Sequence, residues 1–269
     1  MIMKQTSSTL KTFEVEQLGG RIAAEIKIDL GSVTAQEFEL IHEAFLEHLV
    51  LVFPKQNLTA EEQVAFGRLF GDLYLFPHGP GIEAHPYVLP INMPAGLGEG
   101  RWHSDATFDP VPPAISILAA KELPSLGGET MFANQYLAFE SLSEGMQQMV
   151  SRLQAVHDAS SHGRAEDQAT HPVVRTHPDT QRDALFVNAE FTRRFANMSV
   201  KESRGLLDYL TDHAHRPEFC YMHRWAPGDI VMWDNRCAQH YPVINRPDDE
   251  LRRMWRVTVA GTPPMFHSS

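Results

Sequence analysis

The stretch DIVMWDNRCAQHYP, residues 229–242, contains a predicted short strand that indicates the class of fold. Its first six residues are rich in β-branched and aromatic side chains, and turn residues follow them, which predicts a short strand. Short strands late in the chain, with helices mostly early, predict an antiparallel sandwich or barrel flanked by helices. The same strand character recurs in ISILAA (115–120), ETMFAN (129–134), ALFVN (184–188), FCYMHRW (219–225) and WRVTVAG (255–261).

Helices are predicted where a Thr or Ser is followed three residues later by a Glu, which is the capping-box pattern. The pattern opens TAQEFELIHEAFLEHL (34–49), TAEEQVAFGRLFG (59–71) and SVKESRGLLDYLTDHA (199–214). The polar segment SSHGRAEDQATHP (160–172) has no periodicity. We expect it to be a mobile loop, in the position of a lid.

Composition narrows the class of protein. The chain has 269 residues, 43% of them hydrophobic, and a formal net charge of −11, which argues against binding nucleic acid through phosphate contacts. Two cysteines, Cys220 and Cys237, do not make a disulfide framework. We find no secretory signal and no run of about 18 apolar residues, so we expect a cytoplasmic protein that does not span a membrane.

Fourteen histidines raise the question of a metal site. His103 and Asp105, in GRWHSDATF (100–108), would point to the same side of an extended segment. His240, just after the strand DIVMWD, is the best candidate for a third ligand. Two histidines and one carboxylate form the facial triad of non-haem Fe(II) oxygenases. Taken alone, however, a His-x-Asp match arises often by chance, and two polar residues in a surface turn are the plainer interpretation.

Three arginines follow His240 within the next strand that the sequence predicts. In LRRMWRVTVAG (251–261), strand alternation places Arg252 and Arg256 on one face and Arg253 on the other. Two guanidinium groups on an inward face need anions as partners. The alternative is that both arginines pair with surface carboxylates. A hydrolase is disfavoured, because the chain has no G-x-S-x-G turn, and nucleotide-binding glycine motifs are absent too.

Several ordered motifs resemble one family, the taurine dioxygenase and 2,4-dichlorophenoxyacetate dioxygenase family, and more closely its taurine branch. These enzymes depend on Fe(II), 2-oxoglutarate and O2. The resemblance runs from about residue 13 to the C-terminus, and it implies a mainly β fold, a double-stranded β-helix or jelly roll with flanking α-helices, as a single domain over residues 1–269. The motifs are WHSDATF, AAKELPSLGGETMF (119–132), HPVVRTHP (171–178), ALFVN-x-x-FT (184–192), MWDNRCAQHY (232–241) and RRMWRVTVAG (252–261).

The resemblance also implies roles for individual residues. His103, Asp105 and His240 match the iron ligands. Thr130 and Arg252 match the residues that hold the distal carboxylate of 2-oxoglutarate, and Arg256 matches the arginine that meets the substrate's acid group. The spacing from His240 to Arg252 is one residue longer than the family pattern, so Arg253 is the alternative for that role.

One departure from the taurine enzymes concerns the substrate. Their G-x-L-x-x-H-P block reads GDLYLFP (71–77) here, with Phe76 in place of the histidine. Phe108 and Phe191 match other apolar pocket positions. We therefore expect hydroxylation of a small acid-bearing substrate, a sulfonate, carboxylate or sulfate ester, with release of succinate and CO2.

Three other functions stay open at this stage. One is a taurine dioxygenase proper, which releases sulfite. The others are a cupin-like metalloenzyme that does not use 2-oxoglutarate, and a non-catalytic 2-oxoglutarate sensor. We expect a homo-oligomer, a dimer or tetramer, that binds neither nucleic acid nor membranes.

Overall fold

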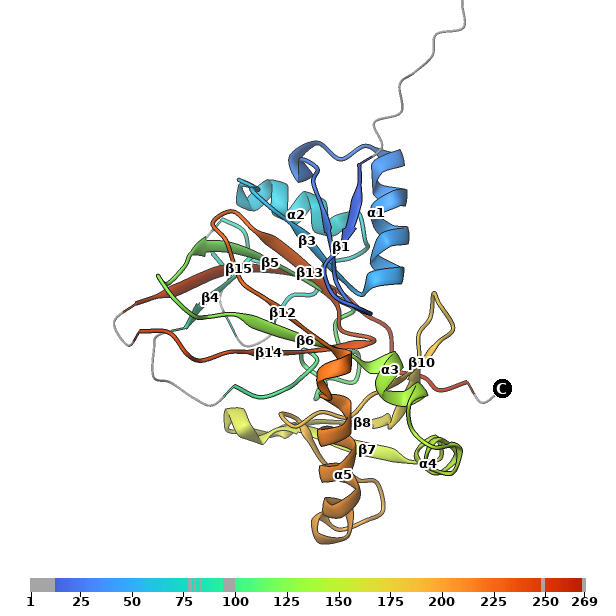
Figure 1. The fold of residues 1–269 in the computed structure, drawn as a ribbon. Coiled ribbons are helices and arrows are strands. Elements are labelled where there is room, and N and C mark those ends of the chain that lie inside the picture. Colours follow the sequence, from blue (N-terminus) through green and yellow to red (C-terminus); the bar gives the residue numbers. More distant parts are fainter. Residues whose placement is uncertain are drawn as a thin grey trace, which may run out of the picture.

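The computed structural model describes residues 13–76, 79, 81–82, 84–93, 100–247 and 250–267. Its largest sheet has seven strands in the order β1-β2-β3-β13-β5-β15-β4 (Figure 1). Neighbouring strands are antiparallel, except that β2 and β3 are parallel. The strands are β1 (Val15–Gln17), β2 (Ala24–Ile26), β3 (Val50–Phe53), β4 (Leu89–Met93), β5 (Ile115–Glu122), β13 (Ile230–Asp234) and β15 (Arg252–Val259).

A second sheet of three strands lies beside the main one, in the order β12-β6-β14 (Figure 1). Its strands are β12 (Cys220–His223), β6 (Thr130–Asn134) and β14 (Ala238–Pro242). A third sheet holds β7 (Gln154–Ala159), β8 (Arg164–Pro172) and β11 (Thr192–Phe195), and a two-stranded sheet pairs β9 (Val174–Thr176) with β10 (Asp183–Leu185). The mainly β architecture predicted from the sequence is therefore confirmed.

Helices pack against the main sheet and against the β9–β10 and β7–β8–β11 sheets. They are α1 (Ala35–His48), α2 (Ala60–Arg68), α3 (Gln135–Glu140), α4 (Glu144–Val150) and α5 (Val200–Ala214), with 3-10 turns at Leu30–Ser32, Ser160–His162 and Pro217–Phe219. The three capping boxes expected from the sequence are all formed, at Thr34, Thr59 and Ser199. In the described ranges no helix is both long enough and apolar enough to cross a membrane.

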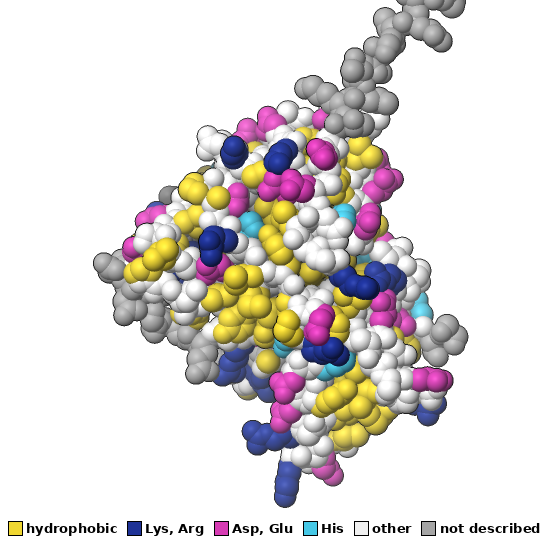
Figure 2. Space-filling model, in the orientation of Figure 1, with side chains coloured by type: hydrophobic (Ala, Val, Ile, Leu, Met, Phe, Trp, Pro, Cys, Tyr) yellow, Lys and Arg dark blue, Asp and Glu magenta, His cyan; other side chains and the backbone are white. Residues whose placement is uncertain are grey.

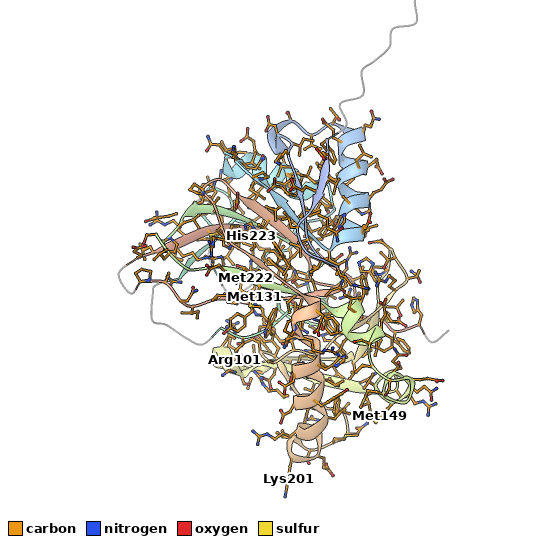
Figure 3. All side chains as sticks on the ribbon, viewed as in Figure 1. Arg101, Met131, Met149, Lys201, Met222 and His223 are labelled. Carbon is orange, nitrogen blue, oxygen red and sulfur yellow. The ribbon has the colours of Figure 1, made fainter. Side chains whose placement is uncertain are left out.

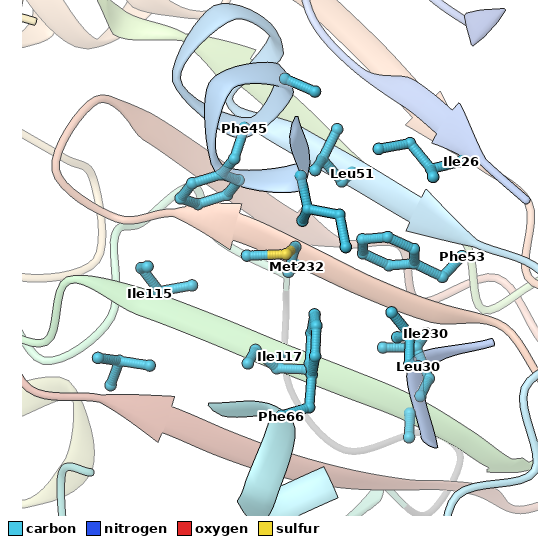
Figure 4. Packing of buried hydrophobic residues seen from close by; sticks show 14 of the residues in the cluster. Ile26, Leu30, Phe45, Leu51, Phe53, Phe66, Ile115, Ile117, Ile230 and Met232 are labelled. Atoms are coloured by element: carbon cyan, nitrogen blue, oxygen red, sulfur yellow. The ribbon is translucent and has the colours of Figure 1, made fainter. Parts of the chain in front are cut away.

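The alternation of side chains along the strands divides the core into two layers. Leu51, Phe53 and Met232 point toward α1 and α2, where they pack with Phe45 and Phe66 (Figure 4). Residues of the opposite parity point toward the second sheet and pack against Phe132 and Ala238; they include Val50, Val52, Leu118, Val231, Trp233 and Met254. Because both faces of the main sheet are covered, its central strands are almost continuously apolar.

Residues 160–172 do not form the loop expected from the sequence. Ser160–His162 make one 3-10 turn, and Arg164–Pro172 form β8, which pairs antiparallel with β7. Only Ala169 and His171 of β8 are buried. Two buried positions are too few to produce a visible period, and this explains why the sequence suggested a loop.

The outward face of the second sheet is partly apolar. Met131 and Met222 lie opposite each other on β6 and β12, and Figure 3 shows them side by side. Met222 is 51% exposed. Figure 2 shows apolar side chains gathered over this part of the surface.

Candidate metal centre

Pairing between two distant segments brings the predicted metal ligands together. The backbone N–H of His103 donates to the carbonyl of His240 at 3.0 Å, and the N–H of His240 donates back at 2.8 Å. This bridge fixes the segment before Asp105 alongside β14. One donor atom from each of His103, Asp105 and His240 lies within 4.8 Å of the other two.

The hydrogen bond of His103 and the burial of His240 favour imidazole nitrogens that can bind a divalent metal. Nδ1 of His103 must donate to the carbonyl of Arg101, 2.8 Å away, which leaves the lone pair of Nε2 free to bind a metal. Burial, and then the nearby His103, lower the pKa of His240 well below its usual value, so its imidazole is neutral. The Nε2 atoms of His103 and His240 lie 3.8 and 4.0 Å from Oδ1 of Asp105.

The carboxylate of Asp105 is buried and ionised. Burial alone would raise its pKa, but the charge of the nearby Arg256 guanidinium lowers it below the usual range. Nη1 of Arg256 lies 2.9 Å from Oδ1, and the hydroxyl of Ser116 donates to Oδ2 at 2.6 Å. One carboxylate oxygen and two imidazole nitrogens that converge in this way fit a non-haem Fe(II) ion.

Thr130 and Arg252 lie together, on β6 and β15. Arg252 is buried, and its Nη2 donates to the Thr130 hydroxyl at 3.3 Å, while its Nε donates to the carbonyl of Gly128 at 3.1 Å. The Trp225 indole donates to the same hydroxyl at 3.1 Å. Burial is the main reason that the pKa of Arg252 is lowered to about 10.

Arg253 points the other way. Its guanidinium is 3.4 Å from Glu122, and both side chains are 49% exposed. The sheet register is irregular here, because Arg253 pairs with Glu122 and Met254 pairs with Ala120. The extra residue lies on β5, so side chains still alternate along β15. Arg252 and Arg256 therefore share the inward face, as the sequence predicted.

A cavity of about 250 Å³ opens beside His103 and Asp105. The predicted residues Arg256, Phe76, Phe108 and Phe191 all line it. The three aromatic rings belong to one apolar cluster with Ala106 and Ala159. The Arg256 guanidinium lies 5.3 Å from the centre of the Phe76 ring.

The same cavity has four polar wall residues that the sequence did not indicate: Arg101, His162, Arg164 and Glu190. Figure 3 shows Arg101 between the second sheet and the β7–β8 strands. Glu190 accepts from His162 at 3.1 Å, and this hydrogen bond is the main cause that lowers the pKa of Glu190 to about 2. His162 and Arg164 belong to the segment that the sequence suggested was a lid. For Arg101 and Glu190, a place beside or within a matched motif was the only signal in the sequence.

A second group of possible ligands, His177, Asp234 and Cys237, does not fit a metal. Arg236 donates to both carboxylate oxygens of Asp234, at 2.8 and 2.7 Å. Nδ1 of His177 accepts from the backbone N–H groups of residues 179 and 180, each at 3.2 Å. Nε2 of His177 therefore carries the proton and donates to Asp234 at 3.0 Å. Because neither ring nitrogen of His177 offers a lone pair to a metal and Arg236 already pairs with Asp234, these residues form a buried ion pair.

Comparison with known proteins decides the family. Residues 14–258 match the family model of the taurine catabolism dioxygenase TauD, TfdA family. The chain belongs to this family. It is 34% identical to an alkylsulfatase of Acinetobacter baylyi, over 92% of this chain and 85% of that protein. It is 33% identical to an (S)-phenoxypropionate/alpha-ketoglutarate dioxygenase of Sphingobium herbicidovorans, over 82% of this chain and 85% of that protein.

A solved structure agrees with the sequence comparison. The crystal structure of a taurine dioxygenase from Burkholderia xenovorans superposes with a TM-score of 0.85 at 33% identity. The match covers 94% of this chain and 92% of that one. The member of the TauD, TfdA family described here is thus an oxidoreductase of the Fe(II)- and 2-oxoglutarate-dependent class, and the resemblance seen in the sequence motifs is confirmed.

Proposed function

We propose that this TauD, TfdA family member hydroxylates a small acid that has an apolar body, and that it releases succinate and CO2. One observation supports this proposal most strongly. The 250 Å³ cavity beside His103 and Asp105 is also lined by Arg256 and by the rings of Phe76, Phe108 and Phe191. Such a cavity admits a small molecule only. The presence of the Arg256 guanidinium and three aromatic rings in its wall suits an alkyl sulfate ester, a sulfonate or an aryloxy carboxylate.

In this proposal the residues divide into three sets. His103, Asp105 and His240 hold iron, and Thr130 and Arg252 hold the distal carboxylate of 2-oxoglutarate. Arg256 binds the acid group of the substrate, and the aromatic rings enclose its body and exclude water. Iron, 2-oxoglutarate and dioxygen together supply the oxidising power for hydroxylation of a C–H bond.

The position of hydroxylation determines the product. For an alkyl sulfate ester, a hydroxyl placed on the carbon that bears the ester oxygen gives an unstable adduct. The C–O bond to sulfate then breaks, the hydroxyl proton is lost, and an aldehyde and sulfate form. The oxidation is balanced by conversion of 2-oxoglutarate and dioxygen to succinate and CO2.

The test is substrate-dependent succinate formation in the presence of Fe(II) and 2-oxoglutarate. We expect n-alkyl sulfates or phenoxypropionate to stimulate it more than taurine does, because Phe76 cannot donate a hydrogen bond to a sulfonate. Taurine dioxygenase proper is the second candidate, favoured by the solved structure, and sulfite release from taurine as the best substrate would establish it. If no acid stimulates turnover, a sensor is favoured, and if 2-oxoglutarate does not bind at all, a cupin-like metalloenzyme is favoured.

We also infer that the facing sheets form a double-stranded β-helix within one domain, and that the protein is a cytoplasmic homo-oligomer, a dimer or tetramer. The continuous family match over residues 14–258 supports the single domain. The exposed apolar surface around Met131 and Met222 supports self-association, because large apolar patches usually mark contact surfaces. Light scattering in solution measures the oligomeric state.

A further inference from the structure

A chain of buried hydrogen bonds ends on the carboxylate of Asp105. Ser116, Asn235 and Trp233 are each at most 2% exposed. Oδ1 of Asn235 accepts from the backbone N–H of Asp105 at 3.1 Å and from the Trp233 indole at 3.0 Å. Nδ2 of Asn235 donates to Oγ of Ser116 at 3.0 Å, and Oγ of Ser116 lies 2.6 Å from Oδ2 of Asp105.

The chemistry of these groups fixes the direction of every bond. A backbone N–H and an indole N–H can only donate, so the Asn235 oxygen must face them and its amide nitrogen must face Ser116. Ser116 therefore accepts from Asn235, and its one hydroxyl proton is directed to Asp105. A separation of 2.6 Å is typical of a hydroxyl that donates to an ionised carboxylate.

The two oxygens of Asp105 thus have separate environments. Oδ2 is held by Ser116, on the side of the protein core. Oδ1 is the oxygen that faces Nε2 of His103 and Nε2 of His240. A carboxylate that is free to rotate can bind a metal through both oxygens and so occupy a coordination position that 2-oxoglutarate or dioxygen needs.

We propose that Ser116 is a positioning residue that holds Oδ2 of Asp105 away from the metal, so that Asp105 binds through Oδ1 alone. The proposal rests on the proposed iron site. Asn235 acts through Ser116, because its amide nitrogen keeps the hydroxyl turned toward Asp105. Loss of the Ser116 hydroxyl lets Asp105 bind through both oxygens and removes one position otherwise open to water or to the cosubstrate.

The experiment uses Mn(II) in place of iron, with the whole chain. Wild type and Ser116→Ala are compared by two measurements. Water proton relaxivity of the Mn(II) complex counts the bound waters, and titration calorimetry gives the affinity of the Mn(II) protein for N-oxalylglycine, an unreactive analogue of 2-oxoglutarate. Ser116→Cys, which keeps a weak donor of similar size, is the second variant.

Thr258→Val is the matched control. Thr258 is the cross-strand neighbour of Ser116 and is 7% exposed, and its variant removes a buried hydroxyl from the same layer. We expect Ser116→Ala to lower the bound-water relaxivity by about a third. We expect it to lower the affinity for N-oxalylglycine by about tenfold or more, which is the size of effect seen when other hydrogen-bond partners of metal ligands are removed. Ser116→Cys should lie between wild type and Ser116→Ala, and Thr258→Val should match wild type.

Three outcomes overturn the proposal. In the first, Ser116→Ala binds Mn(II) but keeps wild-type relaxivity and N-oxalylglycine affinity within twofold. In the second, Mn(II) affinity falls while the water count stays the same, which would show that Ser116 has only a structural role. A wild type that binds no Mn(II) is the third outcome, and this one alone also rejects the proposed metal site.

Discussion

The guanidinium of Arg256 lies 2.9 Å from Oδ1 of Asp105, which is the same oxygen that faces both candidate histidine ligands. One cation thus contacts the candidate metal ligand Asp105 and also lines the cavity proposed to hold the substrate. An acid group that binds Arg256 must share this cation with Asp105. If the proposed roles hold, substrate binding and metal binding are linked through this one side chain, and such linkage acts in both directions.

Removing the carboxylate ligand should abolish metal binding. We expect Asp105→Ala to weaken Mn(II) binding by more than about 100-fold, because even loss of an outer-shell partner costs about 10- to 100-fold. Calorimetric titration measures the affinity, and succinate formation should vanish in parallel. The control is Asp109→Asn, which alters a nearby carboxylate that accepts from Tyr74. Full turnover in Asp105→Ala would reject the ligand assignment.

The two inward arginines should have separable effects. Arg252→Ala should raise the KM for 2-oxoglutarate by about 10- to 100-fold, and Arg256→Ala should do the same for the acid substrate, because hydrogen bonds to charged groups contribute about 1.5–3 kcal/mol. Steady-state kinetics with each substrate varied in turn measures both. Arg253→Ala, on the exposed side of β15, should change neither value. If Arg252→Ala and Arg256→Ala raise the KM for 2-oxoglutarate equally, the proposed division of roles is contradicted.

Phe76 should influence the choice of substrate. We expect Phe76→His to raise the rate with taurine, relative to an n-alkyl sulfate, by about tenfold, since one charge-assisted hydrogen bond is worth about that much. The ratio of kcat/KM for the two substrates is the measurement. Phe76→Leu, which adds no donor, serves as the control. If the leucine and histidine variants shift the ratio equally, Phe76 acts only through its size.

The stability of the fold at acid pH should depend on the ionisation of Glu190. Hydrogen bonding from His162 is the main cause that lowers its pKa from 4.5 to about 2 in the folded state. A lowered pKa of an acid contributes stability above the unfolded value, and that contribution is lost as the pH falls through the folded value. Wild type should therefore exceed Glu190→Gln in stability above pH 4.5, and the gap should close toward pH 2. Urea unfolding at a series of pH values measures the gap, and a gap independent of pH would contradict the assignment.

Local patterns in the sequence predicted much of the scaffold. Capping boxes at Thr34, Thr59 and Ser199 located three helices, because a cap depends on residues only three positions apart. Alternation along β15 correctly placed Arg252 inward and Arg253 outward, because it too depends only on neighbouring positions in the chain. The sequence failed for residues 160–172, where β8 is formed mainly by backbone pairing with β7 and has almost no apolar pattern of its own.

The sequence by itself provided the candidate ligand types, the order of the motifs and the resemblance to the family. Only the tertiary structure showed that Ser116 holds one oxygen of Asp105 and that Glu190 forms part of the cavity wall. The physical reason is distance along the chain. Asp105 and Asn235 are 130 positions apart, so their hydrogen bond exists only once β13 and β5 have paired in the main sheet. Local periodicity has no means of recording such a contact.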